Sequence, residues 1–175
     1  DTIDPTVTLI TPAVVRTYST LNSESSSYEL KDNTVLSKLI NGEFTVSGSQ
    51  NEEGKLDCLI VYLDDRTDNS LTNLAENAIM QKTVTGDNLR NWSTTFRLFE
   101  HSGYEHNKKI VRIVTESHDQ AGNVETVCQG WFVYWNDADT PWINAGFGGT
   151  GGYTNKTIVY PNCSLQGQAY DDDGL

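Results

Sequence analysis

The sequence predicts an all-β fold in which two antiparallel sheets pack face to face. Apolar and polar residues alternate along most of the readable segments, which places every second side chain on one buried face. Thr, Ser, Asn, Gly and Tyr are frequent while Met occurs once, a composition that favours strands and turns. Polar turns separate these short strands, and the combination is typical of a β-sandwich.

The strands can be assigned in order from the apolar residues that share a face. These sets are Val7 and Leu9; Phe44 and Val46; Leu59, Val61 and Leu63; Trp92, Phe96 and Leu98; and Val111 and Ile113. The last strand, Val124 to Trp135, is long and aromatic, and Gly130 is expected to form a bulge in it. Between the third and fourth sets, Leu71, Leu74, Ala78 and Ile79 fall at helical spacing. This spacing is compatible with one short helix near residues 70–80.

The end of the chain repeats its beginning. Residues 4–7 (Asp-Pro-Thr-Val) lead to Phe-Thr-Val-Ser-Gly at 44–48, an acidic turn at 51–54 and a leucine. The second copy has Thr-Pro-Trp-Ile at 140–143, Cys-Ser-Leu-Gln-Gly at 163–167, an acidic turn at 171–174 and a leucine. Each copy of a repeat is one structural unit. We therefore expect a β module over residues 1–137, then a linker and the first two strands of a second, truncated module over residues 138–175.

The first copy contains additional residues. Pro5 to Gly48 spans 43 positions whereas Pro141 to Gly167 spans 26, so the first module carries about 17 extra residues. The polar stretch near residues 14–32 is the predicted insertion.

The charge of the chain excludes some functions. The formal net charge is −12, from 24 acidic and 12 basic residues, which disfavours binding to nucleic acid and to anionic membranes. No apolar stretch approaches the roughly 20 residues that a membrane span requires, so membrane insertion is not expected.

Several motifs occur in an order that resembles a known family. They are Pro-Thr-Val-Thr-Leu-Ile-Thr-Pro-Ala at 5–13, Phe-Thr-Val-Ser-Gly at 44–48, Asn-Trp-Ser at 91–93 and His-Asp-Gln-Ala-Gly-Asn at 118–123. Together with the restart near residue 140, they resemble the tandem immunoglobulin-like (Big-type) repeats of bacterial surface and secreted proteins. The resemblance implies an immunoglobulin-like antiparallel β-sandwich at the cell surface or in a secreted, extracellular protein. It also implies neighbouring immunoglobulin-like modules as partners, and a host or cell-surface protein or glycan as a candidate target.

The immunoglobulin-like topology brings acidic residues together at the junction between modules. Asp137 and Asp139 leave the first module there, and the acidic turn of the second module faces the same linker with Asp171, Asp172 and Asp173. Calcium takes six to eight oxygen ligands and binds Asp carboxylates readily, so this set, with Asp64 or Asp65 as an addition, is a candidate calcium site. A solvated acidic turn that binds no ion is the alternative.

The same topology makes a disulfide between Cys58 and Cys128 unexpected. The two cysteines flank the sixth strand and stand two strand spacings apart, about 9.6 Å, whereas a disulfide needs Cα atoms within roughly 7 Å. Cys163 aligns with Phe44, an inward position, and is expected to be a small core residue or to pair with a cysteine of a completed second module.

The sequence predicts no enzyme. His118 precedes Asp119, but no Gly-x-Ser-x-Gly element or phosphate-binding loop accompanies them. His101 and His106 could meet on one metal, although a polar loop explains both. We expect a structural or adhesion module of a tandem array, in which the short linker and Pro141 stiffen the junction.

Aromatic residues of the last strand give the alternative function. Trp131 to Trp135 is nearly all aromatic, so side chains lie on both faces of the strand. Tyr134 and Trp135, if exposed, could stack on sugar rings, which would make the chain a carbohydrate-binding or accessory module of a secreted enzyme. The competing explanation is that Tyr134 and Phe132 are shielded by the long loop of the first module or by Trp142 across the linker.

Overall fold

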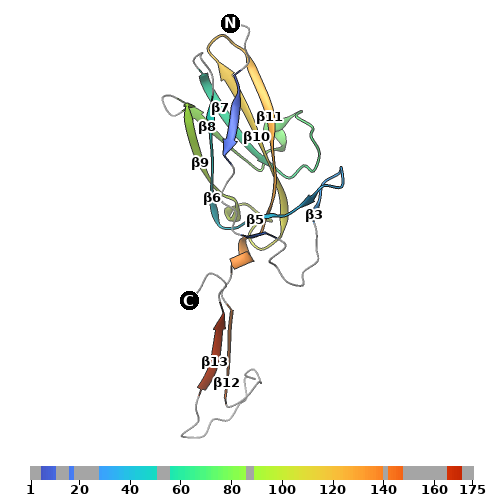
Figure 1. Ribbon diagram of the computed structural model, residues 1–175, viewed down its shortest axis with the longest axis vertical. Helices are drawn as coiled ribbons and strands as arrows, with labels where there is room; N and C mark the ends of the chain where they lie inside the picture. Colours follow the sequence, from blue (N-terminus) through green and yellow to red (C-terminus); the bar gives the residue numbers. More distant parts are fainter. Residues whose placement is uncertain are drawn as a thin grey trace. The chain divides into compact units, whose positions relative to one another are not determined.

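The computed structural model describes residues 5–10, 16–17, 28–50, 56–85, 89–139, 142–147 and 165–170 (Figure 1). The chain divides into two compact units, Asp1–Asp137 and Ala138–Leu175. The division falls in the linker that separates the two copies of the sequence repeat. Within the described residues, no helix is long and apolar enough to span a membrane.

The first sheet of unit 1 has the strand order β1-β6-β9. Its strands are β1 (Val7–Ile10), β6 (Glu43–Gln50) and β9 (Asn91–Arg97), and both neighbouring pairs are antiparallel. Burial alternates strictly along most of β6, so that Phe44 and Val46 face inward while Glu43 and Thr45 face solvent. This alternation is the physical basis of the strand pattern read from the sequence.

The second sheet has six strands in the order β2-β5-β11-β10-β7-β8. These strands are β2 (Arg16–Thr17), β5 (Lys38–Ile40), β11 (Val124–Tyr134), β10 (Lys109–Asp119), β7 (Leu56–Asp64) and β8 (Met80–Thr85). All neighbours are antiparallel except β5 and β11, which run parallel. The sheet is therefore mixed at one edge.

Unit 1 is an all-β sandwich, as the sequence predicts. Both sheets contribute to one buried cluster, which contains Val7, Phe44, Val46, Trp92 and Phe96 from the first sheet and Leu59, Val61, Leu63, Val111, Ile113, Phe132 and Tyr134 from the second. The apolar sets assigned from the sequence are in this cluster, and only Leu9 lies at its margin, half-buried. Phe44 stacks on Phe96 and meets the edge of Phe132, which joins the two sheets at the centre of the core.

Two short segments cover the outer face of the six-stranded sheet. One is a hairpin of β3 (Tyr28–Glu29) and β4 (Val35–Leu36), which buries Leu30 and Leu36 against Val133. It occupies part of the region predicted to be an insertion, which also contains β2, and residues 14–15 and 18–27 of that region lie outside the described residues.

The other covering segment contains α1 (Leu74–Asn77), the one α-helix of the described residues. The sequence is compatible with a longer helix near 70–80, but the helix has one turn because Asn73 is left-handed (φ 51°) and Ala78 is already extended. Leu74 is buried against Tyr62 and Val114, whereas Leu71 remains 39% exposed. The helical spacing is therefore a correct indication over a single turn only.

The bulge predicted at Gly130 is present. The register between β10 and β11 shifts between Ile113, opposite Gly130, and Val114, opposite Cys128. Gln129 is thus the extra residue, and Gly130 adopts φ 138°, a backbone conformation that favours glycine. The bulge turns the side chains of the second half of β11, which brings Phe132 and Tyr134 into the core.

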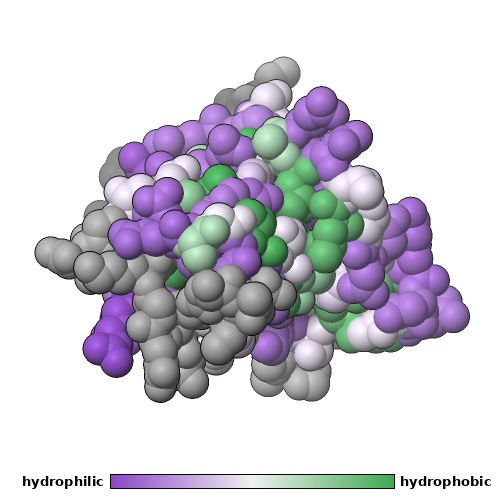
Figure 2. All heavy atoms as spheres, turned by 90° about the horizontal axis from the view of Figure 1, so that it is seen from above, coloured by the Kyte–Doolittle hydropathy of each residue, from purple (hydrophilic) through white to green (hydrophobic). Residues whose placement is uncertain are grey.

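The strands of unit 1 run between two ends, which we name by the elements found there. We call the end with the β10–β11 turn (residues 119–124) the turn pole, and the end where β11 stops at Tyr134 the exit pole. β1 begins at the turn pole, since Val7 lies opposite Gln50 and the Ser117 hydroxyl donates to Pro5 O. Seen from the upper end of Figure 1, hydrophobic side chains form an area bordered by hydrophilic ones (Figure 2).

Unit 2 contains an antiparallel hairpin of β12 (Trp142–Phe147) and β13 (Leu165–Tyr170). Its register reproduces that of β1 and β6. In unit 1, Val7, Thr8, Leu9 and Ile10 lie opposite Gln50, Ser49, Gly48 and Ser47. The repeat aligns these residues with Ile143, Asn144, Ala145 and Gly146, which lie opposite Ala169, Gln168, Gly167 and Gln166. All four pairs coincide.

Candidate functional site

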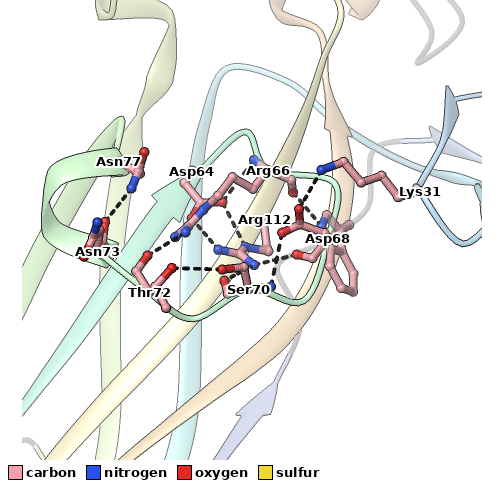
Figure 3. Close-up of polar contacts among 10 residues, drawn as sticks. Lys31, Asp64, Arg66, Asp68, Ser70, Thr72, Asn73, Asn77 and Arg112 are labelled. Carbon is pink, nitrogen blue, oxygen red and sulfur yellow. Dashed lines mark hydrogen bonds and ion pairs between the residues drawn. The ribbon is translucent and has the colours of Figure 1, made fainter.

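The most elaborate polar site among the described residues of unit 1 is a buried ion-pair network at the exit pole (Figure 3). Asp64 ends β7, and Arg112 lies opposite it on β10; both side chains are fully buried. Arg112 Nη2 donates to Asp64 Oδ2 at 2.6 Å and Arg112 Nε donates to Oδ1 at 2.9 Å, a two-point contact. Arg66 adds a second cation, because its Nη2 and Nε also donate to Asp64 Oδ2, at 2.7 and 2.9 Å.

The remaining donors of the two arginines hold the loop after β7. Arg112 Nη1 donates to the carbonyl oxygens of Asp68 and Ser70, at 2.6 and 2.8 Å. Arg66 Nη1 donates to Thr72 O at 2.7 Å. One buried carboxylate therefore receives two guanidinium groups, and backbone carbonyls accept from the other donors. Burying charge is costly unless it is paired in this way.

The network also joins the loop to the covering hairpin and to β11. Trp131 Nε1 donates to Arg66 O at 2.9 Å, and the Lys31 backbone N–H donates to Thr67 O at 3.2 Å. Lys31 Nζ pairs with Asp68 Oδ2 at 2.7 Å, while Asp68 Oδ1 accepts the Ser70 N–H. The loop backbone is consequently fixed from three sides.

This chemistry is structural and excludes Asp64 from the candidate calcium set. Its oxygens already accept five donors, which come from Arg66 and Arg112. A cation would have to displace two arginines, so the suggestion of Asp64 as a ligand is wrong. Asp65 is exposed, and it contributes, after burial, to a raised pKa of the Tyr104 hydroxyl.

Sequence reasoning missed the network, although a signal exists. Arg112 interrupts the apolar run Ile-Val-Arg-Ile-Val of residues 110–114. A cation in the middle of a buried strand requires a buried anion on a neighbouring strand. Asp64, which ends an equally apolar run, is the available partner.

The calcium prediction falls mostly outside the described residues. Asp137 is partly exposed, and its carboxylate oxygens lie 3.1 and 3.2 Å from His106 Nδ1. Of Asp139 only the backbone is described, in the 3-10 helix η3 (Asn136–Asp139). The other three predicted ligands, Asp171, Asp172 and Asp173, lie outside the described residues.

Of the predicted calcium ligands, only the side chain of Asp137 is described, and it contacts His106. Among the described side chains, no group of three or more His, Cys, Asp or Glu could hold a metal ion. Calcium binding by Asp137 and Asp139 together with Asp171, Asp172 and Asp173 thus stays a prediction.

The two aromatic candidates lie in different environments. Tyr134 is fully buried in the core, where its hydroxyl donates to Gly42 O at 3.0 Å, so it cannot stack on a sugar; that assignment is wrong. The bulge at Gln129 puts Tyr134 on the inner face. Trp135 is half-buried, and Lys108 Nζ lies 3.9 Å from its ring centroid. An ammonium group therefore occupies one face of the remaining stacking candidate.

The two cysteines of unit 1 lie on either side of one strand and form no disulfide, as the sequence predicts. Cys58 and Cys128 are free and flank β10, opposite His118 and Val114 respectively. Burial, followed by the charges of Asp57 and Glu116, raises the pKa of the Cys58 thiol, which opposes formation of a nucleophilic thiolate. Cys163 lies outside the described residues.

The histidines form no recognisable catalytic site in the described part of the chain. Glu116 Oε1 lies 2.7 Å from His118 Nε2. His101 packs against Tyr104, and His106 meets Asp137 instead of His101. The two loop histidines therefore do not share a metal in this arrangement.

Comparisons with known proteins add no relatives. No protein-family model, no curated protein and no solved structure matches the chain.

Proposed function

We propose that this chain is part of a tandem array of immunoglobulin-like modules in a bacterial cell-surface or secreted protein. Its role in that array is non-catalytic: it spaces and presents neighbouring modules and contributes to adhesion. The observation that carries the proposal is the shared register of β1–β6 and β12–β13. Four aligned pairs coincide although 37 residues separate Val7 from Phe44 and only 20 separate Ile143 from Cys163.

The register of a strand pair is strongly specified wherever one face of the sheet is buried. A slip of one residue moves every side chain of a strand to the other face of its sheet. Two strand pairs whose connecting segments differ in length would reach the same register by chance only rarely. The agreement supports the interpretation of β12 and β13 as the first and second strands of another module.

The strand order of unit 1 supports the immunoglobulin-like interpretation. One sheet holds the first strand, β6 and β9, and the other holds β11, β10, β7 and β8 in that order. β5 adds a short strand parallel to the last one. In immunoglobulin-like domains, too, the first two long strands share one sheet and the last two share the other.

A carbohydrate-binding or accessory module of a secreted enzyme is the weaker candidate. With Tyr134 buried, a glycan platform would depend on Trp135 alone, and Lys108 covers one of its faces. Stacking of a sugar on that covered face would require Lys108 to move.

A chimaeric chain tests the proposal. Because Leu175 aligns with Leu56, residues 57–137 are appended directly after Leu175. If β12 and β13 begin a module of the same kind, the appended strands complete it. Amide hydrogen exchange of residues 142–147 and 165–170 should then slow strongly relative to the unmodified chain.

The matched control carries the same appended segment with one additional glycine after Leu175. That insertion shifts the connection by one position and opposes the inward and outward pattern of the next strand. Protection in the direct fusion and not in the control supports the array. Unchanged exchange in both chains would indicate that the shared register does not reflect a common module.

A further inference from the structure

We infer that unit 1 forms a two-fold symmetric dimer with a second copy of the chain, in which the open edges of two β11 strands pair. The pairing segment is residues 124–128, the first half of β11, next to the turn pole. The inference concerns unit 1 alone and does not depend on the proposed array. Its tests can therefore fail independently of the exchange test on unit 2.

The six-stranded sheet has an open edge beside the first half of β11. β10 pairs with β11 along one side, from Val124 to Tyr134. On the other side, β5 reaches only Val133 and Tyr134. No strand of the described part of the chain therefore pairs with the outer edge of residues 124–130, all of which are exposed or partly exposed.

The hairpin turn determines which backbone groups face the open edge. Asp119 N–H donates to Asn123 O, and bonded pairs alternate with non-bonded pairs along two antiparallel strands. Glu125 and Val127 therefore direct their backbone N–H and C=O groups toward β10. The residues whose N–H and C=O groups point to the open edge are Val124, Thr126 and Cys128.

Other strand edges of unit 1 carry features that oppose pairing with another chain. On β1, the carbonyl oxygens of Pro5 and Val7 each accept a side chain from the opposite sheet. The edge strand β8 carries the exposed Lys82, and the edge strand β9 carries the exposed Arg97. Covered backbone groups and basic side chains both protect an edge. Residues 124–128 contain no lysine, arginine or proline, and three of the five are β-branched, which favours strand pairing.

The segment is self-complementary about Thr126, which argues for a second copy as its partner. A two-fold axis at this residue places Thr126 opposite its own copy and Val124 opposite the partner's Cys128. This register makes three hydrogen-bonded residue pairs, and each such pair exchanges two backbone bonds. It ends before the bulge at Gln129, which would interrupt a longer pairing.

Side chains on both faces of the sheet are compatible with this register. On the outer face, Val124 is 48% exposed, and the partner's Cys128 would cover it. Two Thr126 side chains meet at the axis, a cross-strand pair that stabilises sheets. On the inner face, Glu125 lies opposite the partner's Val127, so no two charges stand directly opposite each other. The paired strands run in opposite directions, so that in the proposed array the dimer joins two antiparallel chains.

The charge of the chain gives the dimer a characteristic dependence on salt. Each copy has a formal net charge of −12, so two copies repel each other at low ionic strength. Added salt screens this repulsion, since the Debye length falls from about 30 Å at 0.01 M to about 8 Å at 0.15 M. Dimerisation should therefore strengthen as salt is raised, whereas association through complementary charges would weaken.

Analytical ultracentrifugation of the full chain under reducing conditions tests the pairing. We expect a monomer–dimer equilibrium whose dissociation constant decreases as salt is added. Thr126→Lys places two ammonium groups opposite each other at the axis and should raise the dissociation constant roughly tenfold or more. The matched control is Thr83→Lys, which makes the same charge change at an exposed position of the β8 edge and should leave the constant unchanged. A chain that stays monomeric at about 1 mM, or equal effects of the two variants, would overturn the inference.

A disulfide between copies tests the register. In a chain with Cys58→Ser and Cys163→Ser, the change Val124→Cys should give a covalent dimer through the partner's Cys128 in a glutathione redox buffer. Cα atoms of a hydrogen-bonded pair lie about 5.5 Å apart, within reach of a disulfide. Within one chain, positions 124 and 128 are about 13 Å apart at ~3.3 Å per residue, which is too far.

The control for the cross-link adds Cys128→Ser to the same chain. Position 124 of one copy then has no thiol opposite it, and little covalent dimer should form. Equal yields of covalent dimer from the test chain and the control would overturn this register, as would the absence of covalent dimer from the test chain above its dissociation constant.

Discussion

At the residue scale, Asp64 shows how one buried side chain organises a whole pole of unit 1. Its carboxylate is fully buried and pairs with two arginines that differ in exposure, Arg112 at 0% and Arg66 at 18%. The pair of Asp64 and Arg112 is cross-strand, whereas Arg66 belongs to the loop that the network fixes. Buried ion pairs of this kind contribute more to a defined geometry than to net stability.

Removal of the buried Asp64 charge should therefore destabilise unit 1 strongly. Asp64→Asn leaves the Arg112 guanidinium buried without a countercharge, and we expect the free energy of unfolding to fall by about 3–5 kcal/mol. Denaturant unfolding measures this change. The matched control is Asp68→Asn, which breaks the exposed pair with Lys31 and should cost at most about 1 kcal/mol. Equal losses in both variants would contradict a special role for the buried network.

Asp119 provides a dependence of stability on pH. Burial alone would raise the pKa of its carboxyl, but the Asn123 side chain and the backbone N–H groups of Asn123, Ala121 and Gly122 outweigh that effect and lower it below 3.8. A depressed folded pKa means that this stabilisation is present above pH 3.8 and is lost as the pH falls through the lower, folded value. The stability difference between the native chain and Asp119→Asn should be largest near neutral pH and shrink below pH 3.8. Chemical denaturation at several pH values measures it; a difference that stays constant into acid would contradict this assignment.

At the element scale, the strands with an alternating apolar face could be predicted from sequence, whereas β2, β5, β8 and the β3–β4 hairpin could not. Period-2 alternation is a local property, and it located the strands that carry Phe44, Val61, Trp92 and Val111. The β3–β4 hairpin depends on its contact with Val133, far away in sequence, which no local pattern contains. Helical spacing near residues 70–80 indicated α1, but not its restriction to a single turn. The inward position of Tyr134 depends on the bulge at Gln129, which shifts the alternation of β11.

β6 leaves no room for a side chain at Gly48. A Cβ atom there would lie 2.2 Å from Thr8 O and 2.5 Å from the Trp92 ring, so β1 and β9 both approach its backbone. Gly48→Ala should lower the free energy of unfolding by about 1–3 kcal/mol through overpacking. Thermal or denaturant unfolding measures the loss, and Ser49→Ala, on the outer face of the same strand, is the control. A stable Gly48→Ala protein would show that the strands separate more easily than their register suggests.

At the scale of the whole molecule, the two units differ in their capacity to fold alone. Unit 1 buries a core between two sheets, whereas the described part of unit 2 is one hairpin, and an isolated two-stranded hairpin is marginal in water. The sequence located the boundary because the repeat restarts there. The ion-pair network, which joins residues 48 positions apart, was missed because only Arg112 within its apolar run signals it.

Truncation tests the autonomy of unit 1. A chain ending at Asp137 should retain the melting temperature of the full chain, because the described side chains of the core belong to residues that precede that position. Differential scanning calorimetry on both chains, with the enthalpy as a second readout, decides the matter. A clear fall in melting temperature for the truncated chain would show that residues 138–175 stabilise unit 1.

The shared register of β1–β6 and β12–β13 has a consequence for the order of folding. A chain that contains the same strand pair twice offers its six-stranded sheet two candidates for one packing partner, of which only β1–β6 is native. Synthesis favours the native choice, since β1 and β6 leave the ribosome before β7–β11 and about 90 residues before β12. The divergence of the two copies, with Phe44 replaced by Cys163 and Val46 by Leu165, further discriminates between them because the core must fit side-chain volume. In refolding from denaturant, the first copy is not available earlier than the second. Misfolded species in which β12–β13 takes the place of β1–β6 should therefore form more readily during refolding than during translation.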